Sequence, residues 1–561
     1  MLNALAKRKR SLHIYILTWD FAMLYALERE WLPVYKLDWC THRRVHFRMD
    51  DEHPAGASHH EKIVVVDDNT AFVGGFDLTR SRWDTPKHAP KDPRRVNPYG
   101  LAYPPFHDVQ MVVDGEAAAA LGELARERWH RATKRKMPAV RATSGMCWPD
   151  GVKPDLDNVD IAIARTRSAY NGADAIREVE RLYLDAIEAA RRYVYIENQY
   201  VTSSAIGDAL ARRLQEEKGP EIVLVVPRET AGWLEQLTMD VLRARLIERL
   251  KRADRYERLK VYYPDIPGLV DGCVCVHGKI MIVDDTLVRV GSSNLSNRSM
   301  SLDTECDVAI EAGGERVASG IRGFRDRLLA EHLGVAQADV SDTINDQHSL
   351  ISGIERLRSS RRSLCELETH VPELIDQQIP DAALIDPERP IDADRLIAEL
   401  GIGGERSQAY HGGLRLLALL ILLVAFAAAW RWTPLAEQFD TGKIAGLLDD
   451  AKHNPMGSLL AIAVFVIGGL VVFPVTLLIV ATGLVFGPVL GFFYALTGTL
   501  LSAILVYGLG RLMKRDTARR LSGSRLNRLS RQLARRGLMS IVAVRLVPVA
   551  PFTVINLVAG V

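Results

Sequence analysis

Cysteine is scarce in this chain: six of its 561 residues are cysteines, and no two of them are spaced as C-x-x-C. Cys273 and Cys275 alternate along one predicted strand, so their side chains share a face, which favours packing over a zinc site or a disulfide. Free thiols are typical of a reducing compartment. We therefore expect neither a disulfide framework nor a cysteine zinc site.

An excess of charge of either sign is also lacking. The chain has 71 Lys and Arg against 69 Asp and Glu, a formal net charge of +2. A protein that binds nucleic acid usually shows an overall basic footprint. The balance therefore argues against nucleic acid as a partner.

Charged residues are missing altogether from residues 457–510, a stretch of 54 residues. One membrane-spanning helix needs about 20 apolar residues, and a soluble domain rarely has so long an uncharged run. Residues 511–537 follow with ten Lys and Arg against one acid, and by the positive-inside rule this run is expected in the cytoplasm. The sequence thus predicts an integral membrane protein.

The same region predicts a topology. Leu416–Trp430 is uncharged and has interfacial tryptophans at its end, so it is a candidate first span. For residues 457–510 we expect one crossing and a re-entrant hairpin around Pro474–Gly483, because three crossings would leave no room for turns. The part of the chain before Leu416 is then expected in the cytoplasm.

What the chain does contain is a repeated motif. His277, Lys279 and Asp284 read H-x-K-x-x-x-x-D, and residues 60–67 repeat the pattern with His60, Lys62 and Asp67. Alternate residues of an extended strand share a face. Each histidine therefore points the same way as its lysine, and each aspartate falls at the strand end, where we expect it to orient the site.

The two copies stay in register beyond the aspartate. A glycine follows at +14 from each histidine and a polar residue at +17, Asp77 in the first copy and Asn294 in the second. An acid then precedes or opens a short apolar run, Asp108 in the first copy and Glu305 in the second. Internal repeats of this kind indicate a duplicated architecture.

This duplicated pattern resembles the phospholipase D superfamily, the HKD phosphodiesterases. The resemblance implies that both histidines meet in one site between two similar lobes. One attacks phosphorus and forms a phosphohistidine, the other protonates the leaving oxygen, and no metal or cofactor is needed. By analogy with the first-motif histidine of the family, His60 is the expected nucleophile and His277 the acid.

The resemblance also implies supporting roles. Asp108 and Glu305 are expected to hold the two imidazoles in the useful tautomer. The phosphoryl oxygens are expected to contact Lys62, Lys279, Ser292 and Asn294. Arg298 is a candidate for a further phosphate contact, or simply a residue of a helix start. Residues 196–200, I-E-N-Q-Y, resemble a signature of the lipid-cleaving branch.

Strands alternating with helices predict an α/β fold with a mixed, largely parallel sheet. The family implies a two-lobed α-β-α sandwich, and an α-helical membrane domain with re-entrant segments is expected to follow. The expected domains are lobe 1 (residues 1–140), lobe 2 (141–340), a linker and small helical extension (341–410) and the membrane domain (411–561).

The membrane domain has its own repeat. Pro474-Val475-Thr476 leads to Gly483, and Pro551-Phe552-Thr553 leads to Gly560, so both read P-x-T-x6-G. Paired Pro/Gly-broken apolar segments are typical of inverted-repeat transporters. Together with the run around Arg545 they resemble the VTT/DedA (SNARE-associated) family, whose members are linked to lipid scrambling or ion-coupled transport. The chain ends in an apolar run, so we expect this domain to be incomplete.

Together these patterns predict a membrane-tethered phospholipase D-type enzyme that cleaves glycerophospholipids. A phosphatidyltransferase of cardiolipin-synthase type would use the same site with a lipid hydroxyl as acceptor. A nuclease is disfavoured by the neutral charge. A lipid transporter or scramblase with a regulatory HKD part remains a further alternative, and the oligomeric state is left open.

Overall fold

The computed structural model describes residues 2–19, 41–54, 56–138, 140, 148–230, 233–269, 272–369, 386–390, 457–470 and 475–512. The chain divides into two compact units, Met1–Ile391 and Asp392–Val561. The span expected over residues 416–430 lies outside the described residues, as do Pro474 and Arg545.

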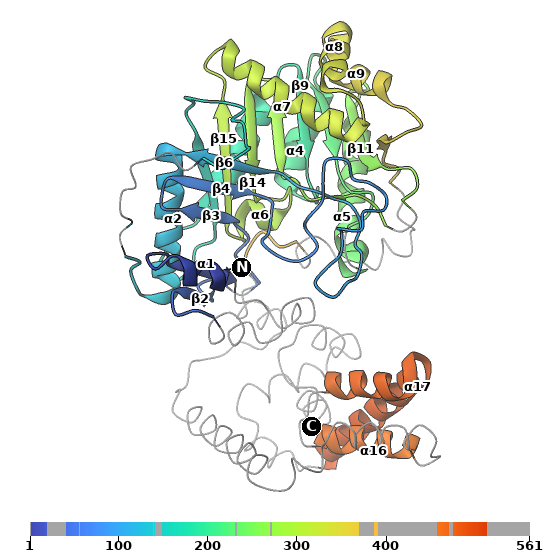
Figure 1. The fold of residues 1–561 in the computed structure, drawn as a ribbon. Coiled ribbons are helices and arrows are strands. Elements are labelled where there is room, and N and C mark those ends of the chain that lie inside the picture. Colours follow the sequence, from blue (N-terminus) through green and yellow to red (C-terminus); the bar gives the residue numbers. More distant parts are fainter. Residues whose placement is uncertain are drawn as a thin grey trace. The chain divides into compact units, whose positions relative to one another are not determined.

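A nine-stranded mixed sheet is the centre of the first unit (Figure 1). Its strands, in spatial order, are β16 (Ser363–Glu366), β11 (Leu259–Asp265), β10 (Glu221–Val225), β9 (Tyr193–Glu197), β13 (Ile280–Val283), β14 (Leu287–Gly291), β15 (Glu305–Glu311), β7 (Ala162–Arg167) and β8 (Ile176–Arg177). Only β9, β10 and β11 pair in parallel. The sheet is mixed as predicted, but the expectation of a largely parallel one is wrong, because short turns such as that between β13 and β14 force antiparallel pairing.

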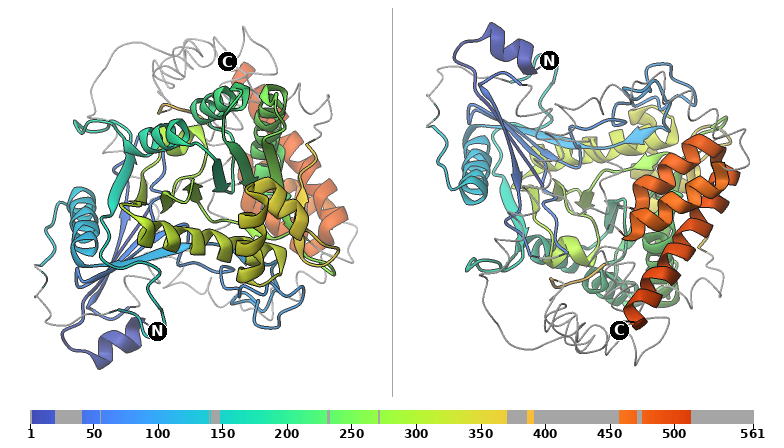
Figure 2. Two further views of the ribbon diagram at one scale, coloured as in Figure 1. Left: turned by 90° about the horizontal axis from the view of Figure 1, so that it is seen from above. Right: turned by 90° about the horizontal axis from the view of Figure 1, so that it is seen from below.

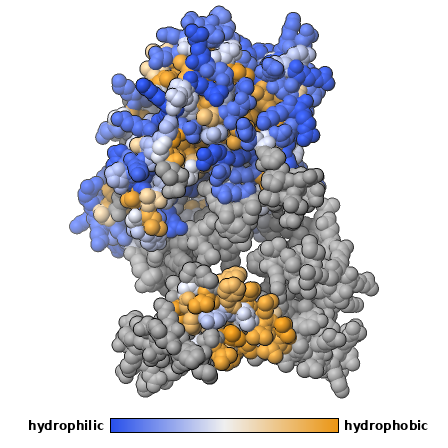
Figure 3. Space-filling view, turned by 90° about the vertical axis from the view of Figure 1, so that its right-hand side faces the viewer, coloured by the Kyte–Doolittle hydropathy of each residue, from blue (hydrophilic) through white to orange (hydrophobic). Residues whose placement is uncertain are grey.

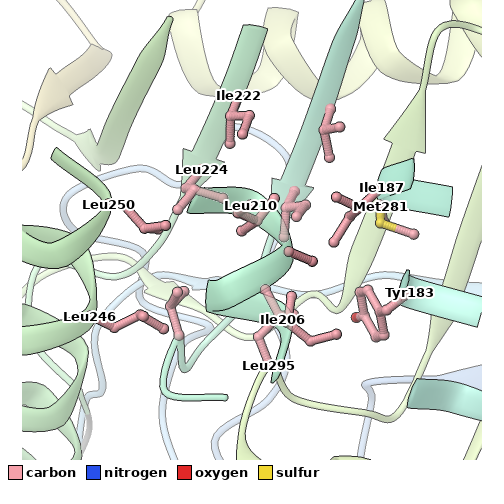
Figure 4. Close-up of a cluster of buried hydrophobic side chains, with 14 of the residues drawn as sticks. Tyr183, Ile187, Ile206, Leu210, Ile222, Leu224, Leu246, Leu250, Met281 and Leu295 are labelled. Atoms are coloured by element: carbon pink, nitrogen blue, oxygen red, sulfur yellow. The ribbon is translucent and has the colours of Figure 1, made fainter. Parts of the chain in front are cut away.

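Helices cover both faces of this sheet (Figure 2, left). The helices packed on one face are α3 (Glu178–Ala189), α4 (Ser204–Gln215) and α5 (Trp233–Ala253). The helices packed on the other are α7 (Glu315–Leu333), α8 (Gln337–Gln347) and α9 (Leu350–Leu357). The first layer buries apolar side chains such as Tyr183, Leu210 and Met281 (Figure 4). This part is the α-β-α sandwich expected of the second lobe.

The first lobe is smaller in the described part of the chain. A three-stranded antiparallel sheet is formed by β3 (Ile63–Val66), β4 (Thr70–Gly74) and β6 (Gln110–Asp114), and α2 (Gly115–Thr133) packs on it. Two strands, β1 (Ile14–Trp19) and β2 (Val45–Asp50), pair separately in parallel after the short helix α1 (Leu2–Arg8). Buried Cys306 and Val308 of β15 join the core of the small sheet, so the two lobes share packing.

Two short elements connect the lobes at the motifs. Strand β5 (Phe106–His107) pairs in parallel with β12 (Cys275–Val276). Helix α6 (Asn297–Ser301) lies in the segment between β14 and β15. The described cysteines, which include Cys273, Cys275 and Cys306, are all free, as the sequence indicated.

The expected linker from residue 341 contains parts of the first unit. Strand β16 joins the large sheet antiparallel to β11. Asp386 is fully buried and accepts hydrogen bonds from Thr202 Oγ1 (2.7 Å) and from the backbone amides of Asn297 (2.8 Å) and Arg298 (2.9 Å). Asp386 of the expected linker therefore packs into the first unit, where its carboxylate satisfies the first amides of α6.

In the second unit the structure describes two helices, α16 (Gly457–Leu470) and α17 (Val475–Leu512). Phe465 of α16 lies against Gly498 of α17, where a side chain would overlap its ring. A break within α17 falls at Gly487, whose φ is 78°. Their residues are predominantly hydrophobic (Figure 3). Among the described residues, no helix combines the length and the apolar character that a membrane span requires.

Candidate active site

Both motif histidines are held by the backbone of the other lobe. The His277 amide donates to His107 O (2.7 Å), next to the β12–β5 pair. The His60 amide donates to Thr304 O (3.0 Å), directly before β15. Each histidine therefore lies beside the segment that carries the other lobe's acid.

The side chains complete this exchange. His60 Nδ1 lies 2.9 Å from Glu305 Oε1, and His277 Nδ1 lies 2.8 Å from Asp108 Oδ2. A carboxylate accepts the Nδ1 proton, which leaves Nε2 of each ring to face a substrate. The structure thus brings together His60, His277, Asp108 and Glu305, and it pairs each histidine with the acid of the opposite lobe.

The motif lysines fold back on their own histidines. Lys62 Nζ donates to His60 O (2.6 Å), and Lys279 Nζ donates to His277 O (2.7 Å). Lys62 Nζ also lies 3.5 Å from a carboxylate oxygen of Asp77. These bonds fix two positive charges beside the two rings, an arrangement that suits an anionic ligand.

Asp77 links the two motifs. Its carboxylate lies 3.5 Å from Lys62 Nζ and 3.9 Å from Arg82 Nη2, and the Arg82 guanidinium lies over the Phe106 ring, which is 5.3 Å from the ring of His277. Burial would raise the pKa of Asp77, but the nearby positive charges, that of Lys62 first, lower it below the usual range. The sequence placed Asp77 at the +17 position but gave it no role.

The two histidine–acid pairs differ electrostatically. Burial raises the pKa of Asp108 to about 7, although Lys279 opposes this. Burial, followed by the charges of Lys279 and Arg82, lowers the pKa of His277 well below its usual value. Burial would raise the pKa of Glu305, but the charge and hydrogen bond of His60 lower it. Burial therefore disfavours charge on the His277 pair, whereas Glu305 is held as a carboxylate.

The exposure of the two rings differs as well. The side chain of His60 is 28% exposed and that of His277 is 8% exposed. Burial also lowers the pKa of Lys279 to about 8. The His60 side of the site is thus open and charged, and the His277 side is enclosed.

The motif aspartates do not lie in this site, contrary to expectation. Asp67 and Asp284 occupy the turns after β3 and β13, with φ values of 52° and 54°. Asp284 accepts hydrogen bonds from the backbone amides of Arg191 (2.6 Å), Arg192 (2.8 Å) and Tyr193 (2.8 Å), which fixes the start of β9. An extended strand separates each aspartate from its histidine, so the aspartates shape turns and strand starts and do not orient the rings.

Ser292 also has a different position from the one expected. Its fully buried hydroxyl donates to Glu305 Oε2 and accepts from the Cys306 amide (3.0 Å), so it orients the acid of His60 and does not face a phosphate. Asn294 is 6% exposed, and its side-chain oxygen has no hydrogen-bond partner in the described part of the chain. An unpaired buried amide is costly, which keeps Asn294 a candidate substrate contact.

Arg298 has a structural role. Its guanidinium donates to both oxygens of Asp303 (3.0 and 2.9 Å). Asp303 in turn accepts from the Ser58 amide (2.7 Å), two residues before His60. Arg298 therefore supports the backbone of the first motif and not the phosphate.

A buried ladder of imidazoles and carboxylates beside the site was missed by the sequence interpretation. His107 Nδ1 lies 2.8 Å from Glu331 Oε1, and His107 Nε2 lies 2.6 Å from Glu197 Oε2. His88 Nε2 lies 3.0 Å from the same Glu331 oxygen, and His332 Nε2 lies 3.1 Å from Glu197 Oε1. The only signal for it was Glu197 in the I-E-N-Q-Y stretch.

The ladder fixes the strand that precedes Asp108. Burial would lower the pKa of His107, but Glu197 and Glu331 raise it to about 10, so the ring is a cation between two carboxylates. Within the described residues, His107 belongs to two groups whose spacing could also hold a metal ion, one with His88 and Glu331 and one with Glu197 and His332. Both ring nitrogens of His107 are already engaged by carboxylates, which fits a hydrogen-bonded scaffold.

Comparison with known families agrees with this geometry. Residues 41–229 match the family model for phospholipase D, and residues 183–323 match the one for the cardiolipin synthase, PLD-like domain. Residues 473–561 match the VTT domain. The chain joins a phospholipase D-superfamily region to a VTT domain.

Individual relatives of the phospholipase D region are distant. The chain is 24% identical over 394 residues to phospholipase D1 of Schizosaccharomyces pombe, covering 53% of this chain and 28% of the relative. It is 26% identical over 373 residues to phospholipase D1 of Saccharomyces cerevisiae, covering 49% and 22%. The chain thus spans about a quarter of the length of these two relatives.

A solved structure is similar at the level of the chain trace. The phosphatidylserine synthase of Haemophilus influenzae Rd KW20 matches with a TM-score of 0.41 and 14% identity, covering 68% of this chain and 83% of that one.

Proposed function

We propose that this protein is a membrane-associated phosphodiesterase of the phospholipase D type, which hydrolyses glycerophospholipids through a phosphohistidine. One observation carries the proposal: each motif histidine has its Nδ1 bound to a buried acid of the opposite lobe. This arrangement frees two Nε2 atoms beside two lysines, which is what a two-step displacement at phosphorus needs.

In the first step His60 Nε2 attacks phosphorus, and the bond from phosphorus to the head-group oxygen breaks. The ionised Glu305 stabilises the positive charge that develops on the ring. His277 gives a proton to the leaving oxygen. The anionic phosphate adds negative charge beside Lys279 and so raises the pKa of His277, which burial and the charges of Lys279 and Arg82 otherwise lower.

In the second step His277 takes a proton from water or an alcohol, whose oxygen attacks phosphorus. The phosphorus–nitrogen bond breaks, His60 is regenerated, and phosphatidate or a phosphatidyl-alcohol leaves. Lys62, Lys279 and Asn294 are the proposed contacts of the phosphoryl oxygens. No step in this sequence requires a metal.

The test is product analysis by mass spectrometry on mixed phospholipids. His60→Asn and His277→Asn should each lower turnover by at least about 10³-fold, and the double variant should be little worse because the pair acts as one unit. His348→Asn, at the exposed end of α8, is the matched control and should keep full turnover. Substantial turnover in either single variant would refute the two-histidine mechanism.

The roles of the two histidines can be separated by trapping. With a slow substrate, His277→Asn should accumulate a phosphohistidine on His60, because attack needs only the nucleophile. A covalent adduct on His277 in the His60→Asn variant would reverse the assignment.

A phosphatidyltransferase is the second candidate, because residues 183–323 match the cardiolipin synthase, PLD-like domain. The same phosphohistidine would then pass to a lipid hydroxyl instead of water. Turnover with and without added glycerol or phosphatidylglycerol separates the two. Products that form only when an acceptor is present would favour the transferase.

The membrane placement is also a proposal, which the VTT match supports. The basic run at residues 511–537 is expected in the cytoplasm, together with the phospholipase part. Cysteines can be placed at Asp440 and Arg525, which lie outside the described residues. In intact cells, an impermeant thiol reagent should label the cysteine at position 440 but not the one at position 525, because the two lie on opposite sides of the membrane. Labelling from the same side would refute one crossing with a re-entrant hairpin.

A further inference from the structure

Residues 78–103 form a long segment between β4 and β5 (Figure 1). The two ends of this segment lie near the candidate site. At one end Arg82 lies 3.9 Å from Asp77. At the other end the Phe106 ring lies 5.3 Å from the His277 ring, and the guanidinium of Arg82 lies 4.9 Å from the Phe106 ring. The segment therefore contacts residues of the site at both of its ends.

The segment is held in one shape by a buried carboxylate. Asp84 accepts hydrogen bonds from the backbone amides of Thr85 and Phe106 (both 2.8 Å) and from Arg95 Nη1 (3.1 Å), and His88 Nδ1 lies 2.8 Å away. His88 connects this hub to Glu331 of α7. The segment is thus fixed to the second lobe as well as to the first.

Its outer end is a small ordered turn. Tyr103 N donates to Arg95 O (3.3 Å) and Asn97 N to Leu101 O (2.8 Å), and Asn97 Oδ1 accepts from the amides of Tyr99 (2.9 Å) and Leu101 (3.0 Å). Tyr99 and Leu101 are held at this tip with 66% and 64% of their surface exposed. Apolar side chains kept this exposed by an ordered backbone usually mark a contact surface.

Exposed apolar side chains concentrate in this segment. The described part of the first unit exposes ten large apolar side chains, and five of them lie between residues 78 and 101: Leu78, Trp83, Val96, Tyr99 and Leu101. The segment also has six Lys and Arg against two aspartates, in a chain whose net charge is only +2. Two of these cations accompany the aromatic rings, Arg94 at 4.7 Å from Trp83 and Arg80 at 5.6 Å from Tyr99.

We propose that residues 78–103 are a docking loop that inserts its apolar tip into an anionic phospholipid bilayer. Trp, Tyr and Leu prefer the interface between head groups and acyl chains, and arginines beside them meet the lipid phosphates. The positive charge of the loop complements an anionic surface. Because both ends of the loop contact the site, docking places a head group next to His60 and His277.

Membrane docking by this loop does not depend on the proposed function, but the effect of docking on phospholipid turnover does. The test uses the full chain reconstituted in vesicles of phosphatidylcholine with phosphatidylglycerol. The double variant Tyr99→Ser/Leu101→Ser should lower turnover of long-chain phospholipid by about ten-fold, since two apolar side chains no longer leave water on docking. Turnover of a water-soluble p-nitrophenyl phosphodiester should stay within about two-fold, since neither side chain touches the catalytic groups.

The matched control is Tyr256→Ser/Val152→Ser, which also removes one exposed tyrosine and one exposed aliphatic residue. Tyr256 even has an arginine over its ring, Arg258 at 4.9 Å, as Tyr99 has Arg80. This control should turn over vesicle lipid like the unmodified chain. An equal loss in both double variants, or no loss in either, would overturn the docking loop.

A second measurement does not depend on catalysis. A bimane label on Leu101→Cys, in a chain whose other cysteines are replaced, should be quenched by brominated lipids, more strongly when phosphatidylglycerol is present. The same label on Val152→Cys should not be quenched. A Leu101 label that is quenched no more than the Val152 label would overturn the proposal. Quenching at Leu101 in a chain that cleaves no phospholipid would support docking while refuting the proposed function.

Discussion

Adding one methyl group at Gly75 should test whether the positions of Asp108 and His277 set the rate of turnover. Gly75 follows β4, and a Cβ atom there would overlap Asp108 Oδ1 and lie 2.9 Å from His277 O and 3.1 Å from Lys279 Cδ. Asp108 cannot simply rotate away, because Oδ1 accepts from the Val109 amide (2.8 Å) while Oδ2 holds His277. The variant Gly75→Ala therefore displaces the acid, the histidine or both.

The size of the effect follows from the contacts. A carbon–oxygen contact needs roughly 3.3 Å or more, so the Asp108 carboxylate must move by on the order of 1 Å. A displacement of that size in a catalytic group lowers turnover by about 10²-fold. Overpacking of this kind also destabilises the fold by about 1–3 kcal/mol, which should leave most molecules folded.

Gly278 provides the control. It lies between His277 and Lys279, but a Cβ atom there would meet Ile280 Cδ1 at 3.4 Å and Glu197 Oε2 at 3.5 Å, both ordinary contacts. Gly278→Ala should keep turnover within about three-fold, since overpacking without overlap disturbs a site little. The assay is hydrolysis of a soluble phosphodiester by the full chain, with thermal unfolding to verify folding. Full activity in Gly75→Ala, or loss in Gly278→Ala, would show that the Asp108–His277 contact does not set the rate.

Three further predictions follow from the charges and turns. Asp67→Asn and Asp284→Asn should both keep turnover within about two-fold, but Asp284→Asn should lower the unfolding free energy by about 1–3 kcal/mol in urea titrations, because three backbone amides lose a carboxylate; loss of turnover at normal stability would return Asp284 to the site. The pKa of His277 in the folded chain lies below its unfolded value of about 6.5, so His277 makes the free energy of unfolding rise with pH up to about pH 6.5. The pKa of Asp108 is about 7 in the folded chain and about 4 in the unfolded chain, so Asp108 makes the free energy of unfolding fall between about pH 4 and pH 7. Asp108→Asn should therefore leave a rising pH dependence of stability and His277→Gln a falling one, and parallel slopes would contradict the assignment. Turnover of a soluble diester should survive EDTA, because the two motif lysines supply the positive charge, and recovery of lost turnover by added zinc or magnesium would count against this.

The sequence could predict the site wherever local spacing and function coincide. His60 and His277 were found because each lies two residues from a lysine at the start of an apolar strand. The acids Asp108 and Glu305 were found because each borders a short apolar run. The structure places all four in direct contact as two pairs.

The motif aspartates show where spacing misleads. Asp284 is seven residues from His277, and a strand advances about 3.3 Å per residue, so β13 carries it to the far end of the sheet. The expected linker over residues 341–410 shows that contacts between distant parts of the chain are also missed by local spacing. Nothing local in residues 363–366 or at Asp386 indicates that they return to the sheet and to α6, because such contacts depend on tertiary packing.

The choice of partner could not be predicted either. Local pattern places an acid near each histidine in the sequence, yet Glu305 serves a histidine 245 residues away and Asp108 one 169 residues away. The buried ladder around His107 is similar, because Glu197 comes from β9 whereas Glu331 and His332 come from α7. Such clusters become visible only when the elements are folded together.

In the proposed mechanism, the pairing of each histidine with an acid of the other lobe also sets the time during protein synthesis at which turnover can begin. A ribosome adds roughly 5–20 residues per second, so Glu305 is made about 12–50 s after His60. During that interval the nascent chain has His60 but lacks Glu305, the acid that binds its Nδ1. Under the proposed mechanism, a chain with only the first motif would lack both the second histidine and the acid that binds His60 Nδ1, so turnover would begin only after the second lobe has been synthesised and has folded onto the first.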